Sequence, residues 1–324
     1  MSLADRAPGL ASERAVLAAR IRQVRLEAED VLSFDFEALH GALPAWTPGA
    51  HVDLHLPSGR ERQYSLCSRP DDPFWRIAVL HQPDGRGGSR EVHAALRPGQ
   101  VATLGLPRNT FRMARAERLV FVAGGIGITP ILPMAEAAEA AGVDWHLHYC
   151  GRSRGRMAFL DRIAALPAAR VTLRSDDCEG RPDIAALVAG SQGAAVHACG
   201  PAPMLEALEA AMAAAGRQDA YRQERFSAAP AALPGDGTIR VHLHRSGGHV
   251  DVPPGQTLLA ALHAAGVNVP CSCEQGFCGT CETRVIAGVP DHRDMLLSEA
   301  ERERGDVMFP CVSRAQGPEI TLDL

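Results

Sequence analysis

Four cysteines near the C-terminal end constrain this 324-residue chain more than any other feature. Cys273, Cys278 and Cys281 follow one another in a C-x4-C-x2-C pattern, and 29 residues separate Cys281 from Cys311. Thiolates are soft, anionic donors that suit iron–sulfur clusters and zinc. The N-terminal sequence lacks the basic start and apolar run of an export signal, so we expect reduced thiols. The pattern therefore predicts a metal site rather than a disulfide framework.

The spacing of these cysteines favours iron–sulfur over zinc. It is the spacing of plant-type [2Fe–2S] ferredoxins. Structural zinc sites usually show two C-x2-C pairs, and here Cys278 and Cys281 are the single pair. Gly276 and Gly279 allow the loop to wrap closely where a Cβ has no room. Cys271 is interpreted as a packed side chain. We predict a [2Fe–2S] cluster on the four cysteines, with zinc as the alternative.

The order of sequence patterns predicts a multidomain chain. Short strand-like runs between turn signals fill the first third and indicate an antiparallel barrel. Strands then alternate with helices from about residue 118, as in a parallel α/β domain. A stretch of small residues and proline reads as a linker. The predicted domains are a β-barrel (1–115), a Rossmann-like nucleotide domain (116–226), a linker (227–237) and a ferredoxin domain (238–324).

A glycine-rich loop after an apolar run marks the nucleotide domain. Gly124, Gly125 and Gly127 lie in VFVAGGIGITPILPM, between a predicted strand and a predicted helix. Glycines let the backbone approach a pyrophosphate, and the following helix N-terminus favours an anion. Thr129 stands where the dehydrogenase fingerprint has its third glycine. The loop therefore predicts a nucleotide site of a different type.

The cysteine-rich segment resembles a known family. CSCEQGFCGTCETRVIAG, HRDMLLSEAE and FPCVSRA are similar to the C-terminal ferredoxin domain of the phthalate dioxygenase reductase family. The resemblance extends over nearly the whole chain and implies the order flavin, nicotinamide, ferredoxin. It also implies a β-grasp ferredoxin domain, FMN rather than FAD, and NADH as the reductant.

Two segments are candidates for holding the flavin. In RQYSL, Arg62 and Tyr64 share one face of a strand, where a planar guanidinium suits phosphate oxygens. The motif resembles the flavin motif of ferredoxin-reductase-like barrels, which implies that Tyr64 packs on the ring and Ser65 bonds its N5/O4 edge. A glycine-rich turn before a predicted helix is the second phosphate candidate. Its predicted binding residues are Gly87, Gly88 and Ser89.

The nicotinamide residues are implied mainly by resemblance. GGIGITP is similar to an element of ferredoxin-reductase-like enzymes in which the threonine contacts the cofactor, here Thr129. HACGPAPML resembles their C-G-P element, which implies Cys199 beside the nicotinamide and a wall of Gly200 and Pro201. Phe226 is expected to cover the flavin. The arginines around Arg152 leave NADPH open, since they could accept a 2′-phosphate.

These sites make one predicted electron path, with Ser65, Cys199 and Phe226 around the reacting centres. Hydride passes from NADH to the flavin, and single electrons pass to the cluster. The sequence shows no motif for an organic substrate, so the acceptor is expected to be another protein. The resemblance implies a Rieske-type non-haem iron oxygenase acting on an aromatic acid. The alternatives are a cytochrome P450 or other acceptor, and a non-catalytic iron–sulfur or zinc module.

Charge and composition narrow the partners. The formal net charge is −5, and all 33 basic residues are arginine. The absence of lysine excludes Schiff-base and P-loop chemistry, and the acidic balance argues against nucleic acid. From Asp236 onward there are 12 acidic residues and 7 arginines, which could form a docking face for a basic partner. No apolar run is long enough to span a membrane. We expect a cytoplasmic monomer.

Overall fold

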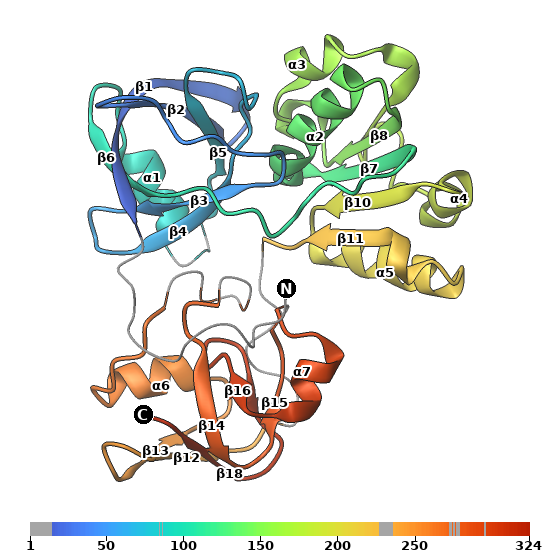
Figure 1. Ribbon diagram of the computed structural model, residues 1–324. Coiled ribbons are helices and arrows are strands. Elements are labelled where there is room, and N and C mark those ends of the chain that lie inside the picture. The colour runs from blue at the N-terminus through green and yellow to red at the C-terminus, as the bar shows by residue number, and fades with distance from the viewer. Residues whose placement is uncertain are drawn as a thin grey trace. The chain divides into compact units, whose positions relative to one another are not determined.

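The computed structural model describes residues 15–83, 85, 87–226, 236–271, 274, 276, 279–294 and 296–324. They fall into two compact units (Figure 1): Arg14–Phe226, and one that contains the described residues from Asp236 to Leu324. Two predicted ligands, Cys273 and Cys278, and residues 227–235 of the predicted linker lie outside the described residues.

Six antiparallel strands form the first sheet, in the order β4-β3-β6-β1-β2-β5. Its elements are β1 (Val16–Ala28), β2 (Val31–Ala38), β3 (His51–His55), β4 (Glu61–Ser65), β5 (Trp75–Leu80), α1 (Gly88–Ala95) and β6 (Val101–Gly105). Just after β4, the Cys67 N–H donates to the Arg76 carbonyl on β5 at 2.8 Å. This contact closes the sheet into the predicted barrel. Phe34, Phe36 and Leu54 are among the side chains that fill its interior.

The first of these strands, β1, carries only a weak strand signal in its sequence. Only Ala19 and Ile21 of the 13 residues of β1 are buried, and arginines occupy several of its exposed positions. A strand that buries so little lacks the apolar alternation by which strands are recognised. Its pairing with β2 and β6 over most of its length therefore holds it in place.

A buried ion pair crosses the barrel wall between β2 and β5. Arg76 Nε and Nη2 donate to the two carboxylate oxygens of Asp35 at 2.6 and 2.8 Å. We expect Asp35→Asn to lower the free energy of unfolding by about 3 kcal/mol, because the guanidinium stays buried without its counter-charge. Glu37→Gln is the matched control, since Glu37 pairs with Arg20 at 3.5 Å on the exposed side of the same sheet. Its loss should be under about 1 kcal/mol. If urea unfolding shows that Asp35→Asn and Glu37→Gln lower the free energy of unfolding equally, the Asp35–Arg76 pair is not the more stabilising of the two.

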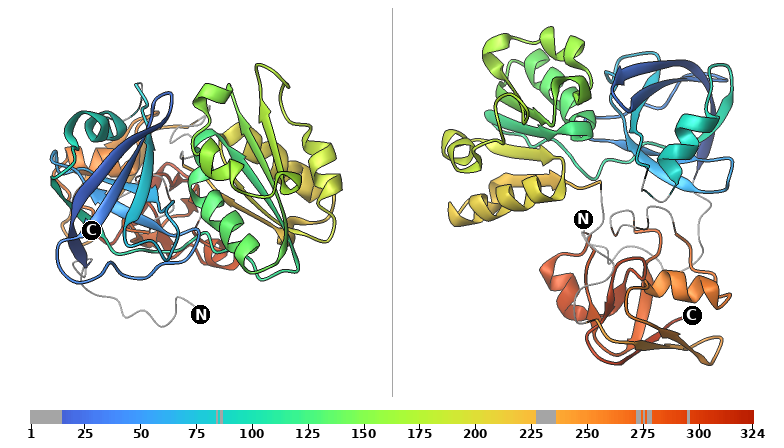
Figure 2. Two further views of the ribbon diagram at one scale, coloured as in Figure 1. Left: turned by 90° about the horizontal axis from the view of Figure 1, so that it is seen from above. Right: turned by 180° about the vertical axis from the view of Figure 1, so that it is seen from behind.

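Five parallel strands form the second sheet, in the order β11-β10-β7-β8-β9. Its strands are β7 (Arg118–Gly124), β8 (Asp144–Gly151), β9 (Val171–Ser175), β10 (Ala195–Cys199) and β11 (Tyr221–Glu224). Its helices are α2 (Ile128–Ala140), α3 (Leu160–Ala164), α4 (Ile184–Gly190) and α5 (Ala202–Ala214), with 3-10 turns at Gly125–Gly127, Arg154–Arg156, Ala168–Arg170 and Gln218–Ala220. Helices α2 and α3 cover one face and α4 and α5 the other (Figure 2). The Rossmann-like prediction is confirmed.

Helix α3 covers only part of the mostly apolar segment MAFLDRIAAL. Met157, Ala158 and Phe159 are buried in the core, and Phe159 takes a left-handed backbone conformation with φ of 63°. Because these residues turn their side chains into the core in a non-helical path, the helix begins only at Leu160.

The barrel and the parallel sheet share one hydrophobic core. Phe111 and Cys67 pack in the same cluster as residues of α2 and β8. Arg162 on α3 donates to the Cys67 carbonyl and pairs with a carboxylate on α2. The Ala114 N–H donates to His197 Nε2 on β10 at 3.0 Å. The two sheets of this unit are therefore packed directly against each other.

A five-stranded sheet in the order β13-β12-β18-β14-β16 organises the C-terminal unit. The described elements of this unit are β12 (Ile239–Leu243), β13 (His249–Val252), α6 (Leu258–Ala264), β14 (Thr283–Ala287), β15 (Pro290–Asp291), α7 (Glu299–Arg304), β16 (Val307–Met308), β17 (Arg314–Ala315) and β18 (Glu319–Leu322). Strands β15 and β17 pair in a separate two-stranded sheet. Strands β12 and β13 pair as an antiparallel hairpin. The helix α6 packs on the sheet through Leu258, Leu259 and Leu262, as in a β-grasp fold. Among the described residues, no helix is long and apolar enough to cross a membrane.

Candidate functional site

The predicted phosphate residues lie together at the start of α1. Gly88 and Ser89 open this helix rather than precede it, and Gly87 caps it with φ of 87°. A Cβ on Gly88 would lie 2.6 Å from Arg62 Nε, so the guanidinium rests against the first helical turn. A cation beside the backbone N–H groups of a helix start is a fitting cradle for a phosphate. The Ser89 hydroxyl accepts from the Gln82 N–H at 3.1 Å.

Tyr64 and Ser65 end the strand β4 that carries Arg62. Burial raises the pKa of Tyr64, so its phenol stays protonated. Ser65 is buried, and it lies opposite His51 of β3 in the antiparallel register. Its hydroxyl donates to Glu224 Oε2 at 3.4 Å, which brings the barrel strand to the end of β11. The predicted flavin edge therefore meets the nucleotide sheet at Ser65.

The two glycine motifs of the nucleotide sheet are in contact. A Cβ on Gly127 would collide with the Cys199 carbonyl and lie 2.7 Å from the Gly200 nitrogen. A Cβ on Gly124 would lie 2.6 Å from Pro201 Cδ. These loops follow β7 and β10, at the point where the strand order reverses, and such switch points are where open α/β sheets bind ligands. Because these glycines have no side chain, the predicted pyrophosphate loop and the predicted nicotinamide wall can lie in direct contact.

Thr129 and Cys199 both lie within this region. Thr129 is buried, and its hydroxyl donates to the Ile126 carbonyl at 3.0 Å. Cys199 ends β10 and is fully buried, opposite Glu224 in the parallel register. Burial and the neighbouring Glu224 carboxyl raise the pKa of the Cys199 thiol well above its usual range. Cys199 is therefore a neutral packing group and not a thiolate nucleophile.

Glu224 is a residue that the sequence analysis missed. It contacts Ser65 and stands beside Cys199, and burial raises the pKa of its carboxyl to about 8. Its carboxyl is therefore mostly protonated at neutral pH. The signal was its place in QERF, two residues before Phe226, at the end of a strand parallel to the Cys199 strand. Phe226 is partly buried and packs against the shared core.

Two arginines near Arg152 form ion pairs with carboxylates. Arg154 pairs with Glu179 at 3.0 Å, and Arg156 pairs with Glu29 at 3.1 Å. Arg152 itself is exposed. The exposed Asp176 follows β9, and its N–H donates to the carbonyl of Gly151, next to Arg152, at 2.8 Å. An acidic side chain beside the second strand of such a sheet is suited to ribose hydroxyls.

The described part of the cysteine-rich segment is compact. Cys281 and Cys311 are buried in one core. Gly276 has φ of 73°, and a Cβ there would lie 2.6 Å from a Val312 methyl carbon. Gly279 also has a left-handed φ, of 76°. Cys271 is half-buried against the same core. A tightly walled glycine loop with buried thiols fits an iron–sulfur cluster, although Cys273 and Cys278 lie outside the described residues.

Comparison with known proteins identifies the chain. Residues 241–316 match the family model described as a 2Fe-2S iron-sulfur cluster binding domain. The chain is 44% identical to the phenoxybenzoate dioxygenase subunit beta of Ectopseudomonas oleovorans over 97% of its length and 99% of that protein. It is 32% identical to the solved phthalate dioxygenase reductase, with a TM-score of 0.73, covering 95% of this chain and 98% of that one. This chain belongs to the phthalate dioxygenase reductase family.

Other relatives agree with this membership. The vanillate O-demethylase oxidoreductase of Pseudomonas putida is 42% identical over 92% of this chain and 96% of its own. A solved type IV self-sufficient cytochrome P450 monooxygenase is 38% identical, with a TM-score of 0.78 over 98% of this chain. This chain spans only 43% of that structure.

The family assignment confirms several predictions. As a phthalate dioxygenase reductase family member, the chain is an oxidoreductase with a barrel, a Rossmann-like sheet and a [2Fe–2S] domain. The individual site residues and the domain bounds at 115, 226 and 237 stay predictions.

Proposed function

We propose that this chain is the reductase component of a Rieske-type non-haem iron oxygenase that dihydroxylates or O-demethylates an aromatic acid. Electrons pass from NADH through FMN and the [2Fe–2S] cluster to the oxygenase. Supporting this, relatives are named as a dioxygenase subunit and a demethylase oxidoreductase. The solved phthalate dioxygenase reductase is described as a modular structure for electron transfer from pyridine nucleotides to [2Fe-2S].

One observation carries the proposal: Glu224 lies between Ser65 and Cys199, bonded to the first and paired in register with the second. Ser65 belongs to the predicted flavin motif, and Cys199 begins the C-G-P element of the predicted nicotinamide site. Glu224 links them, bonded to Ser65 at 3.4 Å and paired in register with Cys199. Hydride transfer requires the two rings to meet at close range, and near-attack placement supplies much of the rate. This junction supports such a meeting point.

Each group of residues then has a defined task. Arg62 and the first turn of α1 would hold the FMN phosphate. Gly124 and Gly127 would admit the NADH pyrophosphate. Bound flavin supplies the ability to accept a hydride and release single electrons. The protonated Glu224 carboxyl and the Ser65 hydroxyl place hydrogen-bonding groups at the junction, and the neutral Cys199 thiol avoids a charge there. Phe226 would cover the flavin.

The cluster and its surroundings complete the proposal. Cys273, Cys278, Cys281 and Cys311 would be its ligands. Thiolate ligands favour a reducing compartment such as the cytoplasm. We propose a monomer with the domain bounds 1–115, 116–226, 227–237 and 238–324.

A cytochrome P450 acceptor is the second candidate. It is favoured by the match to a self-sufficient P450 monooxygenase, in which a similar reductase segment is part of one longer chain. Reconstitution with purified Rieske oxygenases and P450 enzymes would separate the two, by the turnover that each supports.

An anaerobic visible spectrum tests the reductase chemistry. We expect NADH to bleach both flavin and cluster absorbance in the fully loaded protein. NADPH should act much more slowly, because Arg154 and Arg156 are engaged by carboxylates and Asp176 would repel a 2′-phosphate. Asp176→Ser is the matched variant, and it should narrow the difference between the two nucleotides. If neither nucleotide changes the spectrum, the proposal fails. Faster bleaching by NADPH would overturn the choice of NADH.

A further inference from the structure

Helix α3 carries an arginine that reaches from the parallel sheet to the barrel. Arg162 Nη1 donates to the Cys67 carbonyl, in the segment that follows β4. Its Nε and Nη2 donate to the two carboxylate oxygens of Glu136 on α2 at 3.2 and 2.6 Å. The guanidinium also lies over the ring of Phe159, 5.6 Å from its centre. Arg162 therefore joins two helices of the nucleotide sheet to the backbone of the barrel.

The carboxylate of this ion pair is bound from both halves of the unit. The side chains of Arg162 and Glu136 are only 20% and 10% exposed, so water and salt screen their attraction less than at the surface. Arg69, from the barrel, places its Nε 3.6 Å from Glu136 Oε1. A planar guanidinium can bind a carboxylate through two donors and keep a third for a carbonyl. We name Arg162, Glu136 and the Cys67 carbonyl the Arg162 latch.

Cys67 is held through both of its backbone groups. Its N–H donates to the Arg76 carbonyl on β5 at 2.8 Å, and its carbonyl accepts from Arg162. Ser65, two residues earlier, bonds to Glu224 at the end of β11 at 3.4 Å. The end of the predicted flavin motif is thus tied to the parallel sheet at two places, one at β11 and one at α2 and α3. A single tie lets a strand end pivot, whereas two separate ties fix its direction.

We propose that the Arg162 latch fixes the orientation of the end of β4 against the nucleotide sheet, and so sets the rate of hydride transfer from NADH to the flavin. Arg162 and Glu136 are positioning residues, since neither lies in a predicted cofactor motif. The inference rests on the proposed function, in which NADH gives up a hydride with its electron pair and the flavin gains both. Without the latch, this strand end keeps the bond from Ser65 to Glu224 and loses its second tie, so the alignment of the reacting groups is less exact.

The test compares two arginines with similar surroundings. Arg162→Met keeps an unbranched side chain and removes its donors. Arg170→Met is the matched control, because Arg170 Nε lies 3.8 Å from Glu139 on α2 and its guanidinium lies 5.8 Å from the centre of the Trp145 ring. The partners of Arg170 among the described residues all belong to the parallel-sheet half of the unit. This control therefore removes a similar set of contacts without touching the barrel.

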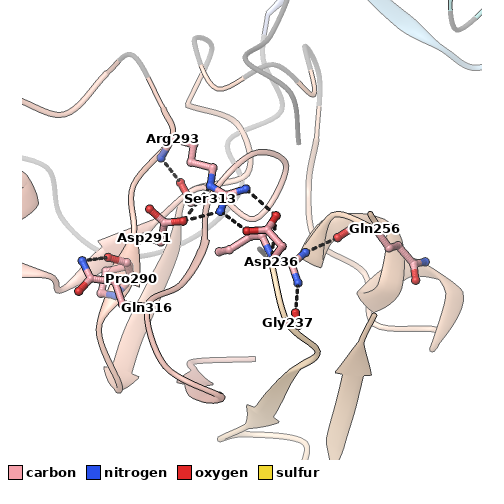
Figure 3. Close-up of polar contacts among 9 residues, drawn as sticks. Asp236, Gly237, Gln256, Pro290, Asp291, Arg293, Ser313 and Gln316 are labelled. Carbon is pink, nitrogen blue, oxygen red and sulfur yellow. Dashed lines mark hydrogen bonds and ion pairs between the residues drawn. The ribbon is translucent and has the colours of Figure 1, made fainter. Parts of the chain in front are cut away.

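A second control removes a largely buried ion pair from the other unit. There Arg293 Nη1 and Nη2 donate to the two carboxylate oxygens of Asp236 at 3.0 and 2.7 Å (Figure 3). Arg314 Nε lies 3.6 Å from the same carboxylate. None of these three residues belongs to the unit that holds the barrel and the parallel sheet. Asp236→Asn should therefore leave flavin reduction by NADH unchanged.

Stopped-flow mixing of each holoprotein with a range of NADH concentrations separates binding from transfer. We expect Arg162→Met to lower the limiting rate of flavin reduction about tenfold, while the NADH concentration at half of that rate changes less than about twofold. The loss stays below the ~100-fold effect of an ångström-scale misplacement because the tie at Ser65 remains. The deuterium isotope effect on this rate should be at least as large as in the wild type, which identifies hydride transfer as the slowed step.

Two further variants test the same latch. Arg162→Lys keeps the charge but not the planar fork, so it should recover only part of the rate. Glu136→Gln keeps the shape of the acceptor and removes its charge, and it should lower the same rate by a smaller factor than Arg162→Met.

Amide hydrogen exchange, measured without NADH, tests the latch independently of the reaction. Exchange over residues 65–69 should accelerate in Arg162→Met, because Cys67 and its neighbours lose their tie to α3. It should match the wild type in Arg170→Met and in Asp236→Asn. Thermal unfolding and flavin content show that each variant is folded and loaded.

Three results would overturn the inference. A wild-type limiting rate in folded, flavin-loaded Arg162→Met would show that the latch sets no rate. An equal loss in Arg170→Met would show that the contact with the barrel has no special effect. Unchanged exchange over residues 65–69 would show that the latch does not anchor this segment. If wild-type protein is not reduced by NADH, the proposed function fails, and the exchange measurement still tests the latch.

Discussion

Replacing Cys311 by serine should stop electron transfer to a protein acceptor and leave flavin reduction by NADH intact. Cys311 is 3% exposed and belongs to the same hydrophobic core as Cys281. Its segment is fixed by the Leu259 N–H, which donates to the Pro310 carbonyl at 2.9 Å, and by two bonds to the Phe309 carbonyl. Serine fits this space but is a harder, far weaker donor for iron. Iron content should fall to less than about a tenth of that of the wild type.

Two acceptors separate the halves of the path in this variant. Reduction of ferricyanide, a small acceptor that can take electrons from the flavin, should stay within about twofold of the wild-type rate, since the first unit keeps its own core. Reduction of the oxygenase should vanish. Cys178→Ser is the control, because Cys178 is exposed and lies in the other unit. A Cys311→Ser protein that keeps two irons would remove Cys311 from the ligand set.

A methyl group at Gly127 should disable the reaction with NADH. Gly127 has φ of −62°, a conformation that alanine adopts freely, so any loss comes from space alone. That space is filled by the Cys199 carbonyl and by the Gly200 nitrogen, 2.7 Å from the place of the Cβ. Backbone atoms cannot rotate away as a side chain can, so the two loops must separate. We expect NADH-dependent flavin reduction to slow at least about 100-fold, since ångström-scale misplacement has effects of this size.

Two further glycine variants, which differ in the space available for a Cβ, test this second prediction. In Gly200→Ala the nearest atom is the flexible Met204 Cε at 2.5 Å, so the loss should be smaller. Gly190→Ala, at the end of α4 with no atom within 4 Å, should react as the wild type does. Dithionite should reduce the flavin of all three variants, and thermal unfolding shows whether each is folded. Wild-type kinetics in folded Gly127→Ala would contradict the contact between the loops.

Local patterns predicted most of the fold. The ligand spacing, the glycine loop after a buried strand and the change from alternation to βαβ periodicity are all local signals. Where burial was weak, as in β1, the signal failed, because partners hold that strand more than its own sequence does. The length of α3 cannot be predicted from composition, because composition does not reveal that Phe159 takes a left-handed backbone conformation in the core.

The sequence motifs predict the candidate site residues, but they do not predict the contacts between residues far apart in the sequence. Glu224 stands out only when β10 and β11 are placed in register. Asp236 ends a stretch rich in small residues and proline, so composition groups it with the linker. Its two arginines come 57 and 78 positions later in the sequence. No local pattern carries such a pairing, because it depends on the tertiary fold.

The core shared by the barrel and the parallel sheet has a consequence for dissecting this enzyme. Phe111 and Cys67 complete the packing of α2 and β8, so neither sheet can be excised without exposing apolar surface. Cooperative units follow buried contacts and not sequence bounds. A truncation at residue 115 would therefore yield two halves that aggregate, whereas a fragment ending at Phe226 keeps its interior whole. The smallest part of this unit that keeps a closed interior therefore holds both sheets.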